Sequence, residues 1–455
     1  MNDISKTIKY LAIILALMAG AVFFYAAGLG TGLYVARASQ IVVVQITATA
    51  STLDLAPTAT PLPPPPTPVG TSAGTPAATQ TPIPLPETTA TQLPTPATDG
   101  NETERVNFDI FWEAWGLLQG DFYGDLPAES ELPYAAIRGV LSSTGDPYTA
   151  FLDPMQADIT RTDMSGSFEG IGATVRLRPD GQFEIVEPLA GYPAITAGVR
   201  AGDIILEVNG IDLAGMNIYE AIALIRGPAG TTVNLRLQRE GIDEPFIIEI
   251  ERARIEMAVV EYEILDGNIA YIRLTEFGET ATAKLEEALK AVLADDPAGL
   301  ILDLRGNPGG YLSVAVEVAS QFVGDGPILI ERFKDGDERP YSALRGGLAL
   351  DVPLVVLVNG GSASASEIVA GAIQDTERGV LIGTTTLGKG SVQAVHTLSD
   401  GSQLRVTIAR WFTPNGRAIH GEGLQPDIEV KISEEDLQAE RDPQLERAVE
   451  YLLGN

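Results

Sequence analysis

Apolar residues in the second half of the chain follow two alternating patterns. Continuous or alternating apolar runs predict strands, and apolar residues at three- and four-residue spacing predict helices. The expected strands are 268–277, 299–310 (which runs into a glycine turn), 353–359, 379–384 and 402–412, and the expected helices are 281–294, 312–323 and one that follows residue 361. Strands and helices in alternation predict an α/β domain with helices packed on a sheet.

The middle of the chain has a different pattern. Short strands are expected at 170–178, 183–189, 202–210 and 232–239, and one helix at 217–227. This order predicts a small barrel-like module with a helix beside an edge strand. Ahead of it, two helical patterns at 106–124 and 133–144 precede a turn-rich stretch at 145–154.

The N-terminal part differs again. Residues 10–36 carry no charge and are numerous enough to cross a bilayer as a helix. Lys6 and Lys9 precede them, which favours a cytoplasmic N-terminus and an extracytoplasmic location for everything after Arg37. A cleavable signal peptide is the alternative, because residues 36–38 read Ala-Arg-Ala. Residues 41–104, rich in Pro, Thr and Ala, predict an extended disordered linker.

Composition narrows the chemistry. The chain has no cysteine, which excludes a cysteine protease, disulfides and thiolate metal sites. With only two histidines, His396 and His420, a histidine-rich metal site is disfavoured, and we expect neither a metal nor another cofactor. A net charge of −31 argues against nucleic-acid binding.

Three serines stand in the stretch GSASASE, at Ser362, Ser364 and Ser366. Ser364 and Glu367 match the S-x-x-E capping box, so Ser364 is expected at a helix N-terminus. The N-terminus of a helix also stabilises negative charge, such as the charge that develops when a serine attacks a carbonyl group. A helix that begins near Ser364 turns only one serine toward a given cleft. The local pattern leaves capping and nucleophilic roles both open.

A nucleophilic serine needs a base. His396 gives no convincing Ser-His-Asp order, whereas Lys389 lies between Gly388 and Gly390, behind an apolar strand. Burial that lowers a lysine pKa from about 10.4 towards 7 costs roughly 4–5 kcal/mol. A lysine in a glycine-rich surface turn is the alternative interpretation of Lys389.

The middle module resembles a PDZ domain. The resemblance rests on GIGA at 170–173 and on AGVRAGDIILEVNG at 197–210. It implies that Gly170, Ile171, Gly172 and Ala173 form a substrate-binding loop, whose backbone N–H groups receive a terminal carboxylate beside an open strand edge. It also suggests Arg226 as a contact that couples the module to the active site; a solvated helix end is the alternative.

Four motifs in order resemble the carboxyl-terminal processing peptidases, the S41 serine proteases with a Ser-Lys dyad: LDLRGNPGG, GSASASEIVAGAIQD, TLGKGSVQ and RWFTPNGRAIHGEGLQPD. The resemblance implies that Ser364 is the nucleophile, Lys389 the base and Gln393 the residue that orients it. It further implies an oxyanion hole from the backbone N–H groups of Gly310 and Ala365. The other matching positions are taken as supporting residues around the dyad: Glu367, Asp375 and Thr386.

The expected fold class is therefore α/β, with a PDZ domain and a ClpP/crotonase-like protease core after a transmembrane helix and a linker. The expected segments are an anchor at 1–40, a linker at 41–104, a helical region at 105–165, the PDZ domain at 166–256, the peptidase core at 257–432 and a C-terminal helix at 433–455. The expected function is a membrane-anchored extracytoplasmic endopeptidase that captures apolar C-terminal protein tails, with self-association considered. A catalytically silent PDZ scaffold or chaperone is the alternative.

Overall fold

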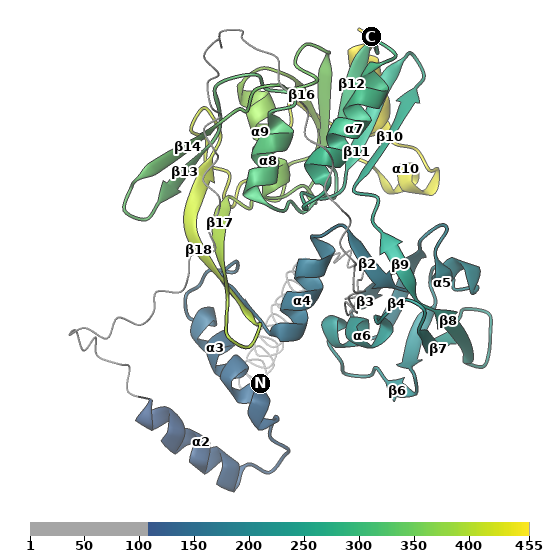
Figure 1. Cartoon of the computed structure of the whole chain (residues 1–455), viewed down its shortest axis with the longest axis vertical. Helices are drawn as coiled ribbons and strands as arrows, with labels where there is room; N and C mark the ends of the chain where they lie inside the picture. Colours follow the sequence, from purple (N-terminus) through teal and green to yellow (C-terminus); the bar gives the residue numbers. More distant parts are fainter. Residues whose placement is uncertain (1–107, 455) are drawn as a thin grey trace, which may run out of the picture. The chain divides into compact units, whose positions relative to one another are not determined.

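The computed structural model describes residues 108–454 (Figure 1). These residues belong to two units. The smaller unit, described from 108 to 133, holds helix α2 (Asp109–Asp121) and the short η1 (Glu129–Glu131), and α3 (Leu132–Ser142) begins at its end. Helix α2 has no buried residue. Everything from Tyr134 onward belongs to the larger unit.

The larger unit contains a small sheet built from the middle of the chain. Its strand order is β3-β4-β5-β7-β8, and β6 pairs with β5. The bounds are β3 (Ala173–Leu177), β4 (Phe183–Pro188), β5 (Ile204–Val208), β6 (Ile211–Asp212), β7 (Thr232–Gln238), β8 (Phe246–Glu251), α5 (Pro193–Thr196) and α6 (Ile218–Ile225). Asn217 caps α6, and the Glu220 carboxylate accepts a hydrogen bond from the Asn217 N–H, which completes a capping box.

A second, six-stranded sheet forms the centre of the C-terminal part of the chain. Its order is β10-β11-β12-β15-β16-β19, with only β10 antiparallel to its neighbour. The bounds are β10 (Val260–Leu265), β11 (Ile269–Leu274), β12 (Gly299–Asp303), β15 (Leu354–Val358), β16 (Val380–Gly383) and β19 (Ile428–Glu429). The inner strands are buried on both faces, as a parallel sheet covered by helices requires.

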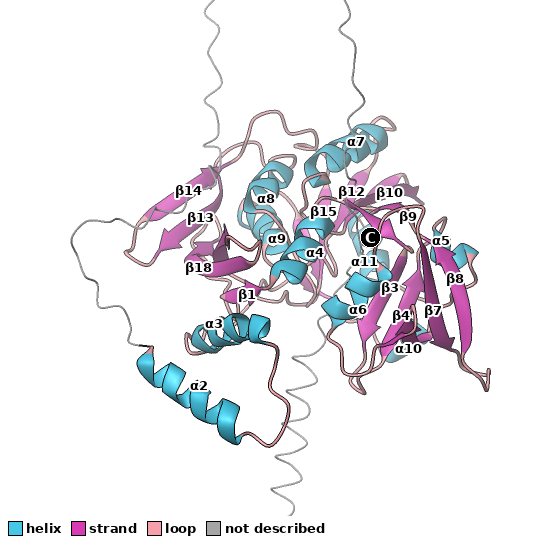
Figure 2. Ribbon diagram, turned by 60° about the horizontal axis from the view of Figure 1, so that its bottom comes forward, coloured by secondary structure: helices cyan, strands magenta, loops and turns pink. Residues whose placement is uncertain are grey.

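Helices cover both faces of this sheet. On one face Leu300 and Leu302 share a core with α7 (Ala281–Leu293), α8 (Leu312–Ala319) and α9 (Ala365–Asp375). On the other face Ile301 packs with α11 (Pro443–Leu452). Figure 2 shows α8 and α9 side by side. The parallel strands all end at the edge where α9 begins, so the loops after β12 and β15 meet there.

A third sheet lies beside this edge. Its order is β1-β18-β13-β14, and β17 also pairs with β18. The bounds are β1 (Ala150–Leu152), β13 (Pro327–Phe333), β14 (Glu338–Ser342), β17 (Ser391–Thr397) and β18 (Gln403–Phe412). A two-stranded ribbon of β2 (Ser167–Gly170) and β9 (Ala253–Glu256) flanks the PDZ-like sheet, and α4 (Pro154–Asp163) and α10 (Glu434–Gln438) complete the description.

The structure corrects the expected fold class. Within residues 108–454 no helix is both long and apolar enough to cross a membrane; α7, for example, has 13 residues, whereas a spanning helix needs about 20. The fold class is mixed α/β, and the transmembrane helix that we included in it is wrong for the described chain. The expected segments 1–40 and 41–104 lie outside the described residues, and the domain limits stay predictions.

Candidate active site

Ser364 directly precedes α9, just after the turn that leaves β15. Its backbone has a φ of 55° and a ψ of −113°, a conformation that costs a residue with a side chain about 1–3 kcal/mol. The surroundings hold it there, since Ser364 N–H donates to Glu367 Oε2 at 2.8 Å. Ser364 is partly exposed at the helix N-terminus, where the helix dipole favours negative charge.

The two flanking serines are fully buried and bonded to backbone. Ser362 Oγ donates to the carbonyl of Leu304 at 2.8 Å, and Ser366 Oγ donates to the carbonyl of Asn307 at 2.8 Å. Both hydroxyls thereby join α9 to the loop after β12. Of the three serines, only Ser364 reaches solvent.

Glu367 connects the two halves of the predicted dyad through their backbones. Its fully buried carboxylate accepts from the N–H groups of Ser364, Gly388 and Lys389, and from Thr386 Oγ1, at distances between 2.5 and 2.9 Å. Four donors offset the cost of burying the charge. Thr386 in turn accepts from Leu424 N–H at 2.7 Å. Glu367 and Thr386 therefore support the site as the sequence predicts, but through the main chain.

The turn that carries Lys389 requires its two glycines. A Cβ on Gly388 would stand 2.9 Å from the nitrogen of Gly423, and one on Gly390 would stand 2.6 Å from the nitrogen of His420. Both distances are too short for real contacts. Glycine therefore allows the lysine turn to pack directly against the 420–423 loop.

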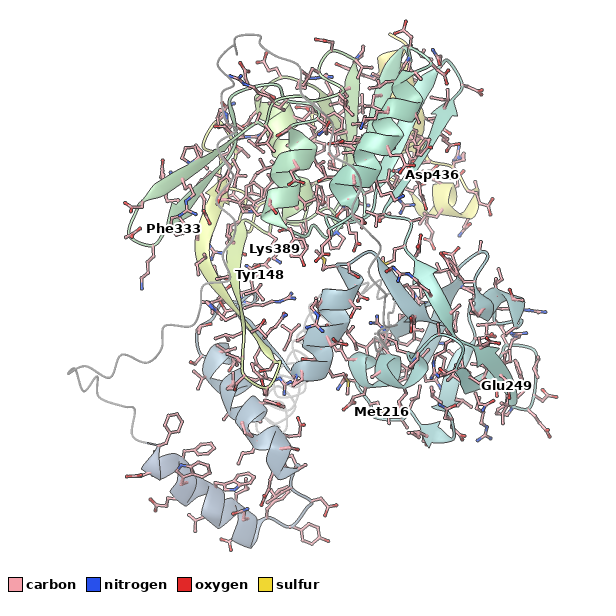
Figure 3. The ribbon with its side chains drawn as sticks, in the orientation of Figure 1. Tyr148, Met216, Glu249, Phe333, Lys389 and Asp436 are labelled. Carbon is pink, nitrogen blue, oxygen red and sulfur yellow. The ribbon has the colours of Figure 1, made fainter. Side chains whose placement is uncertain are left out.

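The Lys389 side chain lies beside an aromatic ring (Figure 3). Its Nζ is 5.4 Å from the centre of the Tyr148 ring. Burial lowers the pKa of Lys389, the positive charge of Arg405 lowers it further, and Glu367 acts in the opposite direction. Among residues 108–454 no hydrogen bond joins Nζ to the Ser364 hydroxyl. The structure thus joins the two backbones through Glu367, without a hydrogen bond between the two side chains.

Gln393 is not bonded to Lys389 either. Its Nε2 donates to Ser391 Oγ at 2.8 Å and to Thr407 Oγ1 at 3.5 Å. The pairing of β17 with β18 shifts register between Val392 and Gln393, and such a bulge changes the direction of the following side chains. The expected orienting contact is absent from the described part of the chain.

The predicted oxyanion donors lie at facing loops. Residue Gly310 forms a bridge with Phe277 that uses the Gly309 carbonyl and the Tyr311 N–H, so the Gly310 N–H stands outside the bridge. The neighbouring Gly309 approaches the nucleophile: a Cβ there would lie 2.8 Å from Ser364 Cβ and 2.9 Å from Ala365 N. The predicted donor Gly310 and the glycine that packs on Ser364, Gly309, are thus neighbours in one turn.

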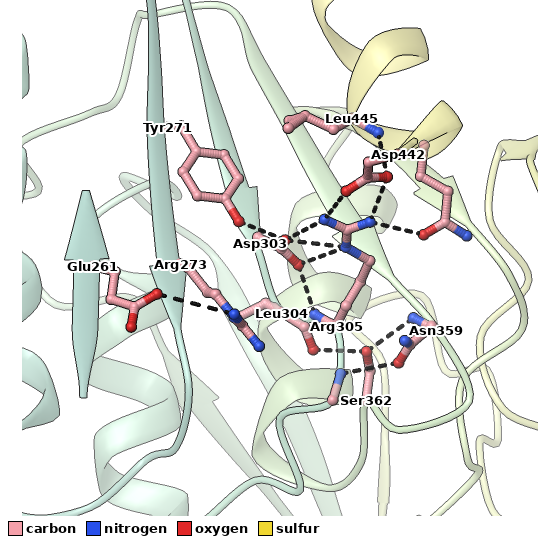
Figure 4. A network of polar contacts seen from close by, with 12 residues as sticks. Glu261, Tyr271, Arg273, Asp303, Leu304, Arg305, Asn359, Ser362, Asp442 and Leu445 are labelled. Atoms are coloured by element: carbon pink, nitrogen blue, oxygen red, sulfur yellow. Dashed lines mark hydrogen bonds and ion pairs between the residues drawn. The ribbon is translucent and has the colours of Figure 1, made fainter. Parts of the chain in front are cut away.

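Two further residues in the loop after β12 were not singled out from the sequence. Asn307 is fully buried, donates to the Leu274 carbonyl and accepts from Gly309 N–H. Arg305 pairs with Asp303 at 2.6 Å and with Asp442 at 2.8 Å (Figure 4). The sequence could have indicated these two residues through the motif LDLRGNPGG, in which charged and amide residues follow a buried strand.

Asp375 lies at the other end of α9 from Ser364. It accepts from the Asn415 N–H at 2.8 Å and forms an ion pair with Arg417. Its role is therefore to hold the 413–417 turn against the helix. The structure does not bring Asp375 into the group around Ser364.

The PDZ-like module has an apolar pocket between β3 and α6. Of the four residues predicted there, Ile171, Gly172 and Ala173 line the pocket and Gly170 does not; the other lining residues are Phe168, Val175, Ile222, Ile225 and Arg226. Gly172 has a φ of 73°, and a Cβ there would lie 2.4 Å from Tyr192. The close approach explains why this loop needs glycine.

Arg226 is a buried wall of that pocket. Its side chain is 7% exposed and donates to Asp163 of α4 at 2.8 Å. Burial raises the pKa of Asp163 to about 7, and Arg226 acts against that rise. Arg226 is therefore no solvated helix end, and the pocket is connected by one ion pair to the segment that precedes it.

The fold and the site together define a PDZ-bearing serine-type peptidase. The model of peptidase family S41 matches residues 268–430, and that of a PDZ domain matches 184–239. The carboxy-terminal processing protease CtpA of Bacillus subtilis is 38% identical over 71% of this chain and 69% of its own length. A carboxy-terminal-processing protease of Bartonella bacilliformis is 40% identical over 68% of this chain and 72% of its own.

The chain therefore belongs to peptidase family S41 and is a serine-type carboxy-terminal processing peptidase, which confirms the resemblance found in the sequence. Among solved structures, a photosystem II D1 C-terminal processing protease is similar, with 31% identity, a TM-score of 0.47, and coverage of 72% of this chain and 89% of the other.

Proposed function

We propose that the protein is an endopeptidase that binds apolar C-terminal tails of other proteins in its PDZ pocket and cleaves near the C-terminus with Ser364 and Lys389. The observation that supports this most directly is the Glu367 carboxylate, which binds the main chain of both residues. The pocket next to Arg226 is apolar on most of its walls, which suits an apolar tail.

The proposed reaction begins with a neutral Lys389, which takes the proton of the Ser364 hydroxyl. Ser364 Oγ then attacks the scissile carbonyl, and the N–H groups of Ala365 and Gly310 stabilise the oxyanion, each worth about 3–4 kcal/mol. The protonated lysine gives its proton to the leaving amine. Water, activated by the same lysine, hydrolyses the acyl-enzyme. Before the first step the amine must form a hydrogen bond with the Ser364 hydroxyl.

Cleavage of a small folded reporter that carries an apolar C-terminal tail tests this proposal, with products identified by mass spectrometry. We expect Ser364→Ala and Lys389→Ala each to abolish tail removal, whereas Lys431→Ala, a change at a lysine whose side chain is 76% exposed, leaves it intact. Tail removal by Ser364→Ala at the wild-type rate would overturn the dyad assignment. Equal cleavage of reporters with apolar and charged tails would overturn the tail preference.

We further propose that the protein works on the extracytoplasmic side of a membrane, to which its N-terminal residues attach it. The support is the uncharged stretch 10–36, which follows two lysines. Digestion by an added protease tests the location, in intact and in broken spheroplasts. We expect the catalytic part to be digested in intact spheroplasts. Full protection of it until the spheroplasts are broken would overturn the proposal.

Self-association is also proposed. Its support is α2, whose large apolar side chains include Ile110, Trp112 and Leu117, all more than half exposed. Light scattering after gel filtration tests it. We expect the wild type to have a mass above that of one chain, and we expect this mass to fall when Trp112 and Leu117 are both changed to Glu. A monomeric wild type would overturn the proposal.

A further inference from the structure

A segment that precedes the PDZ module supplies one wall of the lysine site. Tyr148 lies in the loop between α3 and β1, whereas the match to family S41 begins at residue 268. Nevertheless its ring stands 5.4 Å from Lys389 Nζ (Figure 3). A residue outside the matched region is thus the aromatic neighbour of the predicted base.

The loop that carries Tyr148 is fixed by its own polar contacts. Asp146 accepts from the Tyr148 N–H at 3.2 Å and from Thr149 Oγ1 at 2.7 Å. Thr149 Oγ1 in turn accepts from the N–H of Thr407 on β18 at 3.1 Å. The loop is therefore attached to the strand that also carries the Gln393 contact, and the ring is held in place from both directions.

A second residue also contacts the ring. His420 meets it edge to face, with 5.7 Å between ring centres, and the backbone of His420 lies against Gly390, next to the lysine. Tyr148 is therefore packed between the 420 loop and the Lys389 side chain. The position of Tyr148 is therefore set by its own loop, by β18 and by the 420 loop.

Two effects of the ring on the amine oppose one another. A ring face attracts a cation within about 6 Å, so 5.4 Å is close to the limit, where that attraction is weak. Covering the amine removes water, which disfavours its charged form. The other charged groups that act on Lys389 are Arg405 of β18, which also disfavours the charge, and Glu367 of α9, which favours it. Around the ring itself stand Asp146, Arg410 and Glu367.

We propose that Tyr148 is a positioning residue for the base: its ring covers the Lys389 amine and keeps water from it, so that the amine is neutral when substrate arrives. The inference rests on the proposed role of Lys389 as base. The aromatic ring, not the hydroxyl, has this role, because the contact with Nζ is made by the ring face.

The test is the pH dependence of kcat/KM for fluorescently labelled casein, an unfolded general protease substrate. For Tyr148→Ala we expect the acid limb to move up by about one pH unit, which is a loss approaching about tenfold at pH values on that limb and is recovered at pH values above it. Tyr148→Phe is expected to restore the wild-type limb. Tyr341→Ala, at another half-buried tyrosine, should leave the limb in place. An equal loss at every pH for Tyr148→Ala would overturn the proposal.

A second readout needs no turnover. In the Ser364→Ala background, trace acetylation with acetic anhydride across pH reports the titration of each lysine by mass spectrometry, with the exposed Lys284, Lys290 and Lys431 as internal references. Adding Tyr148→Ala should shift the Lys389 midpoint up by about one unit and leave the references unchanged. An unchanged Lys389 midpoint would overturn the proposal even if activity falls.

The two readouts separate this inference from the proposed function. If Ser364→Ala still cleaves casein, the dyad fails, yet the labelling experiment still decides whether Tyr148 covers the amine. If Tyr148→Ala does not fold, Tyr148→Gln is used: it keeps part of the side-chain volume and replaces the apolar ring with a polar amide, and an acid limb moved in the same direction, with a loss of at least about threefold in rate on that limb, is expected. An unshifted limb for a folded Tyr148→Gln counts against the proposal.

Discussion

The nucleophile side and the base side of the site are built differently. Around Ser364 the polar groups are joined densely, with Glu367 accepting four hydrogen bonds and Asn307 using both ends of its amide. On the base side, Arg405 Nε, Arg410 Nη1 and His420 Nδ1 are buried without a hydrogen-bond partner in the described part of the chain. The first region is fixed and the second has contacts still to make.

The main chain around the site is therefore held rigidly, whereas side chains on the base side can still adjust. An oxyanion hole has to be preorganised, because its donors must not rearrange as charge develops. A base can be brought in later, provided that its turn is already in place. Glu367 meets both needs, since it fixes the backbone of Lys389 and makes no bond to its amine. Substrate binding would then complete the base side.

Removing the central carboxylate should have the largest effect. In Glu367→Ala, three backbone N–H groups and the Thr386 hydroxyl lose their acceptor inside the protein, and each unsatisfied buried group costs about 1–3 kcal/mol. We expect a loss of stability of about 4–5 kcal/mol in urea unfolding and a fall in kcat/KM of more than about a thousandfold. Glu249→Ala, at an exposed glutamate, is the control. A stable Glu367→Ala that retains activity would mean that the dyad is held by other contacts.

A pair of glycines in one loop separates close packing from backbone conformation. Gly309 and Gly306 both have positive φ, 100° and 72°, but only at Gly309 would a Cβ meet Ser364 and Ala365; at Gly306 nothing lies within 4 Å. We expect Gly309→Ala to reduce kcat by about a hundredfold, because Ser364 is displaced, and Gly306→Ala to cost only about 1 kcal/mol of stability. Equal kinetic effects of the two substitutions would show that conformation alone matters.

The sequence predicted well what local chemistry determines. Apolar runs located the central strands, because strands of a parallel sheet are buried on both faces. The S-x-x-E pattern placed Ser364 at a helix start, which the structure shows. The turn around Lys389 was anticipated from its two glycines, and the structure gives each of them a close backbone neighbour.

Other features depend on long-range packing that no local pattern records. Tyr148 meets Lys389 only because β1 pairs with β18 and brings the loop ahead of β1 to the site. Asp442 reaches Arg305 from the C-terminal segment in the same way. A register shift decides where Gln393 points. Gly309 packs on Ser364 and Gly310 on Phe277 because of how the loop after β12 meets the start of α9 and the end of β11.

A buried acid at the end of β11 should make stability depend on pH. Burial, and then the charge of Asp163, raise the pKa of Glu276 from 4.5 to about 7. The folded state thus binds a proton that the unfolded state has released, so stability is lost as pH rises from about 4.5 to 7. At about 1.4 kcal/mol per unit, with a reduction for partial exposure, Glu276→Gln should be about 2–3 kcal/mol more stable than wild type at pH 8 and equal to it at pH 4. Urea unfolding at both values checks this, with Glu249→Gln as control; an equal difference at the two values would contradict it.

A substitution at Gln393 should have the smallest effect on activity and tests the base side of the site alone. The Gln393 amide is bonded to Ser391 and Thr407, so the proposed orienting contact with Lys389 has still to form. Gln393→Leu should therefore lower kcat about tenfold, leave KM unchanged and change stability by less than about 1 kcal/mol. Gln238→Leu, at a strand glutamine whose amide donates to two backbone carbonyls, should change neither constant. A loss in stability with unchanged kcat would instead make Gln393 a structural residue of the β17–β18 pair, and the orienting role would then have to belong to another group around Lys389.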